Sequence, residues 1–473
     1  MEPQEEDRTR LLPDDVLADV LSRLAPRGLA TSRCVCAAWR AVIDGRGLLR
    51  ADLLPPSSLA GLFINYGGDC RFSCTGILFS RPSSATTSTE VTTSYRMPYT
   101  YVQDHCNGLL LLHGAVVNPA TGRRAPLPEC PPLPTAMERF YREMYLVFDP
   151  AAATPSAEQY EVVSIPRPPD PDRDDDDELE KKIIIRPRWP VRGPTTRRLE
   201  RSLLRSEWPP SPYVLDVFSS TTGRWEKRSF TRDGEAAGTT LADLQLEYRW
   251  VPCRRSVYWR GALYVHCEND FVMRISMSNN TYHIIKPPRE VSDRCGEIYL
   301  HLGRSEKGVY SALYDSDESK LQVWILEESS RGVMEWILRH ESSPGLLQAS
   351  LNCRRQKHGP WILRGLYNRQ RKEPVQHSTF DEWNSDDDDS VLNVGDGSTN
   401  QYCSGCLDIL GFHPYKEIVF LHTSRLDRGL AYHLKTSKLE DLGDLYPPRS
   451  NASRIDSCVP YTPCLAGELP ESL

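Results

Sequence analysis

Short apolar segments separated by turn residues run through this chain from residue 50 onward, and they constrain its fold more than any other feature. The segments have the length and the Val, Ile and aromatic content of strands, and helical periodicity is absent between them. Strands at such regular short spacing favour an all-β sandwich, barrel or propeller. The predicted strands are Leu109–Leu112, Val116–Val117, Met144–Phe148, Tyr160–Ile165, Tyr213–Phe218, Trp225–Phe230, Val257–Trp259, Ala262–His266, Val272–Met277, Tyr282–Ile285, Val309–Leu313, Gln322–Leu326, Met334–Arg339, Ile409–Phe412, Ile418–His422 and Ala431–Leu434.

A loose internal repeat favours the propeller among these folds. Asn118–Arg123, Asp216–Trp225 and His433–Leu439 each place an outgoing strand before a Thr/Ser-Gly or Ser-Lys turn, after which the next strand returns. A propeller repeats such a unit every few tens of residues, because one blade buries little until its neighbours stack on it.

The first part of the chain has a different pattern, typical of short helices. Pro13, Asp14 and Asp15 suit a helix start, where a missing N–H costs nothing and negative charge is favourable. Apolar residues follow at helical spacing, and Pro26 ends this first helix. A second apolar set ends at Ile43. Two or three short helices share only a small core. We therefore expect an exposed apolar face that contacts a partner.

Residues 11–44 resemble the F-box motif. The matching residues are Leu12–Asp15, Val20, Leu21, Leu24, Pro26, Leu29, Arg33–Cys36, Trp39, Arg40 and Ile43. The later strands resemble the F-box-associated β-propeller domains of plant F-box proteins. That resemblance rests on Cys106–Leu111, Val117–Arg123, Tyr213–Ser220, Val257–Tyr264, Leu321–Leu326 and Leu410–Pro414.

The two resemblances imply an α+β chain with two domains. A small all-α F-box covers residues 8–50, and an all-β propeller-like domain covers 58–446, followed by a flexible tail at 447–473. Charged insertions at 168–207 and 381–400 interrupt the β domain, and their like-charge runs favour disorder. Residues 181–205 are basic and could contact RNA with Trp189 and Trp208, but a solvated loop is the favoured interpretation.

The resemblance also implies a function. An F-box docks on the Skp-type adaptor of a Skp–cullin–F-box ubiquitin ligase, and the remaining chain then binds a target protein whose identity the sequence does not give. On this interpretation no residue is catalytic and no cofactor is needed. An adaptor-binding scaffold or ligand sensor not coupled to ubiquitylation is the alternative, and a propeller enzyme is a further one. The predicted adaptor contacts are Leu12, Pro13, Val16, Leu17, Val20, Leu21, Leu24, Leu29, Val35, Cys36, Trp39 and Ile43.

Two residue clusters contain the side chains of a metal site or a Cys/His nucleophile, but neither has the spacing that such a site requires. Cys403 and Cys406 form a CxxC, yet the spacing to His413 and His422 matches no usual zinc site, so structural thiols are favoured. His105 and Cys106 are adjacent, and neighbours in a strand point to opposite faces, so they cannot pair directly. The chain has no GxSxG, P-loop or HExxH motif.

Composition and charge limit the classes of partner and the cellular compartment that we expect for this chain. The 473 residues carry a net charge of -7, so the chain as a whole is not basic, as a nucleic-acid-binding protein usually is. Residues 1–10 contain no apolar run and no 18-residue apolar stretch follows, so neither a secretory signal nor a membrane span is predicted. The 14 cysteines are then expected to be reduced thiols in the cytoplasm or nucleus.

Overall fold

The computed structural model of the chain describes residues 13–24, 29, 32, 37–46, 48, 59–67, 75–81, 101–120, 122–150, 159–169, 201–246, 255–268, 271–288, 300–315, 319–329, 332–343, 360–364, 391–392, 407–423, 426–446 and 454–464.

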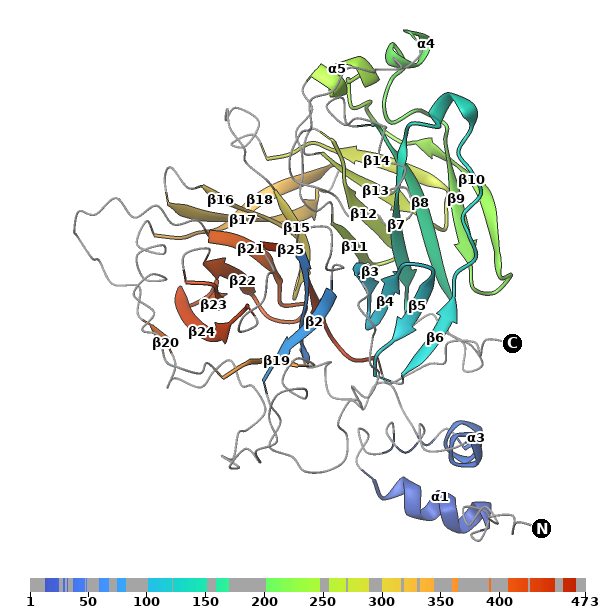
Figure 1. Cartoon of the computed structure of the whole chain (residues 1–473), viewed down its shortest axis with the longest axis vertical. Coiled ribbons are helices and arrows are strands. Elements are labelled where there is room, and N and C mark those ends of the chain that lie inside the picture. The colour runs from blue at the N-terminus through green and yellow to red at the C-terminus, as the bar shows by residue number, and fades with distance from the viewer. Residues whose placement is uncertain are drawn as a thin grey trace.

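Helices come first in the chain and strands dominate the rest, as predicted. The N-terminal helices α1 (Asp14–Ser22) and α3 (Ala37–Gly45) lie at one end of the molecule, apart from the strands (Figure 1). Two short helices, α4 (Arg201–Leu204) and α5 (Leu241–Leu246), lie at the opposite end. No helix in the described ranges has the length and apolar character needed to cross a membrane.

The strands form antiparallel four-stranded units, which we call meanders; most are made of strands that are consecutive in the chain, and one combines strands from both ends of the β region. Three of them each use four strands that are consecutive in chain order. The first is β3 (Val102–Cys106), β4 (Leu109–Leu112), β5 (Ala115–Asn118) and β6 (Arg123–Pro126). The second is β7 (Tyr141–Phe148), β8 (Tyr160–Arg167), β9 (Tyr213–Ser219) and β10 (Arg224–Arg232), and the third is β11 (Ser256–Trp259), β12 (Ala262–His266), β13 (Val272–Ser276) and β14 (Thr281–Ile285). The second and third belong to one 8-stranded sheet, because β10 and β14 pair in parallel at Thr231–Thr281 and Arg232–Tyr282.

Three further sheets complete the β region. They are β15 (His301–Ser305), β16 (Gly308–Asp315), β17 (Lys320–Glu328) and β18 (Met334–Glu341); β21 (Leu407–Phe412), β22 (Ile418–Thr423), β23 (Arg428–His433) and β24 (Lys438–Asp444), with β20 (Val391–Leu392) beside β24; and β19 (Ile362–Arg364), β2 (Thr75–Ser80), β1 (Gly61–Gly67) and β25 (Arg454–Tyr461). With the two halves of the 8-stranded sheet and β3–β6, the described part contains six meanders.

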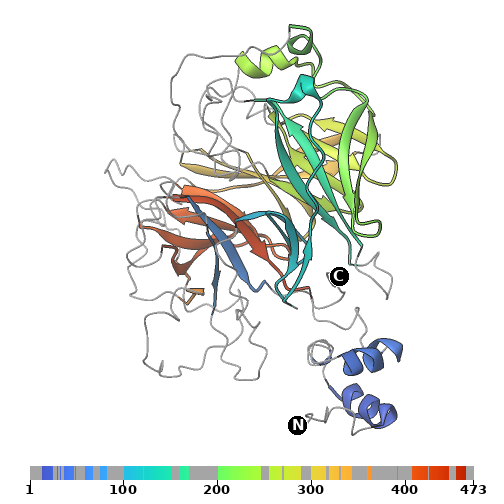
Figure 2. The ribbon, with the colours of Figure 1, turned by 45° about the vertical axis from the view of Figure 1, so that its right-hand side comes forward.

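The six meanders close into a propeller-like ring. One edge strand of each meander, which we call its inner strand, contacts the next in the order β25, β3, β7, β11, β15 and β21, and β21 contacts β25 again. The ring closes because β1 pairs with β25, so that Gly61 lies opposite Tyr461; the blue and red strands lie side by side in Figure 2. This arrangement agrees with the propeller-like fold expected from the sequence.

The core is divided among the contacts between neighbouring meanders. Each neighbouring pair shares one cluster of buried side chains, and the six clusters follow one another around the ring. The largest cluster packs β7–β10 against β12–β14 around Phe230 and Tyr282. A single meander therefore buries only one part of its apolar surface, and its stability depends on both neighbours.

The predicted repeat occupies the same place in three meanders. Residues 118–123, 219–224 and 433–438 connect the third strand to the fourth in their sheets. The turns from first to second strand also recur. Both residues of the Asn107-Gly108 turn have positive φ, as a two-residue type I′ hairpin requires. Only glycine fits at position 108, because a Cβ there would lie 2.6 Å from the backbone nitrogen of Cys464.

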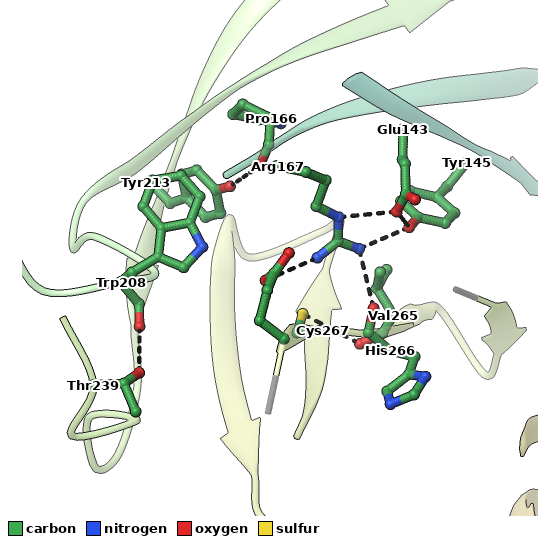
Figure 3. Close-up of polar contacts among 11 residues, drawn as sticks. Glu143, Tyr145, Pro166, Arg167, Trp208, Tyr213, Thr239, Val265, His266 and Cys267 are labelled. Atoms are coloured by element: carbon green, nitrogen blue, oxygen red, sulfur yellow. Dashed lines mark hydrogen bonds and ion pairs between the residues drawn. The ribbon is translucent and has the colours of Figure 1, made fainter. Parts of the chain in front are cut away.

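A buried arginine ties two meanders together (Figure 3). Arg167 on β8 forms ion pairs with Glu143 Oε2 at 3.0 Å and Glu268 Oε2 at 3.4 Å, and it donates to the hydroxyl of Tyr145 and the carbonyl of His266. Only 2% of its side chain is exposed. Burial opposes the charge of Arg167, but the carboxylates of Glu268 and Glu143 outweigh it and hold the pKa of the guanidinium high.

The structure corrects the sequence analysis at two places. The predicted tail at 447–473 contains β25, which completes the ring, so the β region extends beyond residue 446. The predicted insertion 168–207 is partly ordered, since Leu203 and Leu204 of α4 pack on the core, and β20 lies within 381–400. Most of both insertions lies outside the described residues.

Candidate functional sites

The first candidate site is the N-terminal helical unit. Helix α1 begins after Pro13, whose carbonyl accepts the first bonds from the N–H groups of Val16 and Leu17. Asp14 and Asp15 lie in the first turn, where the helix dipole favours negative charge. Asp15 also pairs with Arg46, just beyond the end of α3, so the two helices are joined by charge as well as by packing.

The apolar residues of α1 divide into two faces. Leu17, Ala18 and Leu21 are buried and pack with Val42 and Ile43 of α3, and Leu29 completes this small core. The other face is exposed: Val16 and Val20 of α1, and Leu24 just beyond its C-terminal end, have exposed fractions of 45%, 50% and 40%. These three residues recur every four positions and form one stripe, which we call the exposed stripe.

The twelve residues predicted to contact an adaptor therefore fall into exposed, buried and undescribed groups. Val16, Val20, Leu24 and Pro13 are exposed, and Trp39 is partly buried against the helical core. Leu17, Leu21, Leu29 and Ile43 are buried within the unit itself, and their direct contacts are with one another. Leu12, Val35 and Cys36 lie outside the described residues. The sequence pattern places all the α1 residues on one stripe, and only the position of α3 decides which of them are covered.

The second candidate site is a cavity of about 670 Å³ in the centre of the ring. Residues from all six inner strands line it, so it exists only when the ring is closed. Its volume lies in the range of pockets that hold small molecules. Sequence reasoning missed this site, because its residues come from strands far apart in the chain.

The arginines in and beside this cavity differ in whether they form an ion pair with a carboxylate. Three arginines have carboxylate partners: Arg454 with Asp456 at 2.6 Å, Arg142 with Asp216 at 3.3 Å, and Arg167 with Glu143 at 3.0 Å. Arg255 and Arg304 make no ion pair with a carboxylate among the described residues. Each uses one guanidinium nitrogen in a hydrogen bond, to the carbonyl of Cys458 and to Oδ1 of Asn107 respectively.

Arg304 is held at one end of the cavity. It projects from the end of β15, and its Nη1 donates to Asn107 Oδ1 at 2.7 Å. Its guanidinium carbon lies 4.8 Å from the ring centre of Trp259 and 5.8 Å from that of Tyr415. Its Nε is buried and has no acceptor within the described part of the chain. Trp259 supports the guanidinium of this arginine.

Two histidines next to these arginines are uncharged near pH 7. Burial, together with the charges of Arg255 and Arg304, lowers the pKa of His105 to about 4. Burial and the charge of Arg255 also hold the pKa of His301 well below its usual value. Both imidazoles can therefore donate and accept hydrogen bonds without adding charge.

Asp104 is the buried acid of the cavity wall. Its Oδ2 accepts the backbone N–H of Leu146 at 2.8 Å and the hydroxyl of Ser256 at 2.9 Å. Burial raises the pKa of Asp104 to about 7, although these hydrogen bonds act in the opposite direction. The carboxyl group thus joins β3 to β7 and β11.

The nucleophile, metal site and RNA contact considered from the sequence find little support in the described residues. Cys106 is buried and its thiol donates to the carbonyl of Phe148, and burial raises its pKa, which disfavours a nucleophilic thiolate. Cys403 and Cys406 lie outside the described residues, which contain no group of three or more His, Cys, Asp or Glu suited to a metal. Trp208, considered for RNA contact, is instead buried beside Phe140 and Tyr213.

The geometry defines a two-part protein, with a helical unit that exposes an apolar stripe and a ring of strands that encloses a cavity. Residues 9–51 match the F-box-like family, so the chain carries an F-box-like domain at its N-terminus. The chain is also similar to the F-box protein At3g07870 of Arabidopsis thaliana, with 29% identity over 128 residues. That match covers 25% of this chain and 30% of the relative.

Proposed function

We propose that this chain is the substrate-receptor subunit of a Skp–cullin–F-box ubiquitin ligase in the cytoplasm or nucleus. The exposed stripe of Val16, Val20 and Leu24 docks on the Skp-type adaptor and, through it, on the cullin. The β region holds a target protein. The observation that carries the proposal is an unburied apolar stripe within the segment that matches the F-box-like family.

The exposed stripe supports docking on energetic grounds. Fully burying an exposed Val or Leu side chain contributes about 1.5 to 3 kcal/mol. The three stripe residues are 40% to 50% exposed, so docking would gain roughly half of that for each, which is still a useful share of an interface. The residues beneath the stripe are already packed, so the helical unit can dock without rearranging its core. Docking of this kind leaves the chemistry to other subunits, because the receptor acts by holding a target close to the charged ubiquitin thioester.

A charge-matched pair of variants of the full chain tests adaptor docking. Val20→Asp with Leu24→Asp places two charges in the stripe, and we expect at least about a 100-fold loss of affinity for purified Skp-type adaptor, because the charges would be buried. Ser22→Asp with Arg23→Gln changes the net charge equally at neighbouring exposed positions of the same helix segment, and should bind within a few-fold of the wild type. Affinity is measured by calorimetry, with circular dichroism as the check on folding.

The choice of residues decides whether this test can be interpreted. Leu21 is only 1% exposed and lies in the core of the helical unit, so Leu21→Asp should unfold the unit and abolish docking indirectly. Undiminished adaptor binding by the Val20→Asp/Leu24→Asp variant would contradict the proposed docking face.

The alternative is an adaptor-binding scaffold or ligand sensor that does not send its cargo to ubiquitylation. The central cavity favours a ligand-responsive receptor, because Arg255 and Arg304 line it and form no ion pair with a carboxylate of the described residues. Loss of the protein distinguishes the two: a target of the ligase accumulates, whereas the partner of a scaffold keeps its level.

A further inference from the structure

We propose that the central cavity binds a small organic anion whose phosphate or carboxylate group is held by Arg255 and Arg304. The site is formed by the strands alone and does not depend on adaptor docking.

The balance of charge favours an anion at this position. Arg142, Arg167 and Arg454 each form an ion pair with a carboxylate, although Arg142 shares Asp216 with Lys227. Arg255 and Arg304 are not paired with a carboxylate in the described ranges. Both arginines line the same cavity, and both lie close enough to His105 for their charges to act on it. A cavity with low-dielectric walls strengthens the attraction of two such charges for one anion.

The acidic groups of the cavity do not cancel this charge. Glu143 and Asp456 are engaged by Arg167 and Arg454. The oxygens of Asp104 accept hydrogen bonds from Leu146 and Ser256. Glu129 is exposed to solvent, where its charge is screened.

The hydrogen-bond donors of the two arginines are also incompletely used. A guanidinium group carries five N–H donors in a planar fork that matches phosphate and carboxylate oxygens. One nitrogen of each arginine donates to the protein, and the buried Nε of Arg304 has no acceptor among the described residues. An anionic oxygen would satisfy such donors, whose lack of a partner is otherwise unfavourable.

The position of Arg304 is fixed before any ligand binds. Contacts with Trp259, Tyr415 and Asn107 restrain its side chain from three different strand ends. This preorganisation reduces the entropy lost on binding. The neutral imidazoles of His105 and His301 add donors or acceptors for the rest of the ligand. The cavity volume of about 670 Å³ suits a small molecule and is too small for a folded partner.

Titration of the full chain with simple probes tests the site. We use phenyl phosphate and benzoate as anions and phenol as their uncharged counterpart, and follow binding by calorimetry. At least one anion should bind at least about tenfold more tightly than phenol, and the ratio between the two anions distinguishes a phosphate site from a carboxylate site. Raising the salt concentration should weaken anion binding.

Matched variants connect the binding to the two arginines. Arg255→Gln and Arg304→Gln should each weaken anion binding at least about tenfold, because each removes one charge and its donors. Arg274→Gln is the control, since Arg274 also stacks on an aromatic ring, that of Tyr264, but does not line the cavity. It should bind within twofold of the wild type. If a Gln variant has a lowered melting temperature, Arg304→Lys, which keeps the charge but loses the planar fork, should bind with intermediate affinity.

Two results would overturn the proposal. One is that neither anion binds more tightly than phenol, and the other is that the Gln variants bind the anion as the wild type does. Adaptor affinity is measured on the same variants and should be unchanged, so a failure of the cavity proposal is distinguishable from a failure of adaptor docking.

Discussion

At the scale of single residues, Arg167 shows how a buried charge can hold two meanders in place. Its guanidinium forms ion pairs with Glu143 of β7 and with Glu268, which follows two residues after the end of β12, and both carboxylates are buried or nearly buried. Such a cluster adds little net stability when complete, but the loss of one member leaves the other charges uncompensated.

Arg167→Met should therefore lower the free energy of unfolding by about 3 to 5 kcal/mol, because Glu143 and Glu268 would remain buried without a cation. Arg339→Met is the comparison, since the Arg339–Glu327 pair joins β17 and β18 at the exposed surface and should contribute no more than about 1 kcal/mol. Chemical denaturation followed by tryptophan fluorescence measures both. Equal effects of the two substitutions would argue against a special role for the buried cluster.

At the scale of elements, Asp104 joins three inner strands through one carboxyl group. Because burial raises its pKa to about 7, the native state keeps the proton of Asp104 at pH values where the unfolded chain has released it. Its contribution to stability is complete below about pH 4, and it decreases as the pH rises to about 7, by at most about 1.4 kcal/mol per pH unit.

Asp104→Asn should remove this dependence, since an amide can keep the bonds to Leu146 and Ser256 without titrating. The stability of the wild type relative to Asp104→Asn should fall between pH 4 and pH 7, as measured by denaturation midpoints of both proteins. The comparison is needed because His105 and His301, whose pKa values are lowered, change stability in the opposite direction. Parallel pH profiles for the two proteins would show that Asp104 does not titrate in this range.

The elements also show what the sequence can and cannot predict. Strands such as Ile418–Thr423 are apolar and bounded by turn residues, so local pattern suffices to find them. Strand β25 contains Pro460 and several polar residues, and it is a strand because β1 lies beside it. Arg255 and Arg304 likewise come together only in the closed ring, so no local pattern indicates the cavity they line.

At the scale of the whole molecule, the ring depends on the last described strand. Removal of residues 447–473 deletes β25, exposes β1 and opens the cluster that includes Val459 and Tyr461. We expect this truncation to lower the melting temperature strongly or to cause aggregation through the exposed strand edge. Removal of residues 465–473 keeps β25 and should have little effect. Similar thermal unfolding of the two truncated proteins would mean that β25 is not required for closure.

The pairing of β1 with β25 also determines when this protein can finish folding during its synthesis. Strand β1 is synthesised about 400 residues before its partner, so the ring cannot close until residues 454–461 have also been synthesised. The helical unit, by contrast, is built from contacts within residues 15–48 and can form as soon as it emerges. A nascent chain could thus present its adaptor-docking face before it has a site for a target or a ligand.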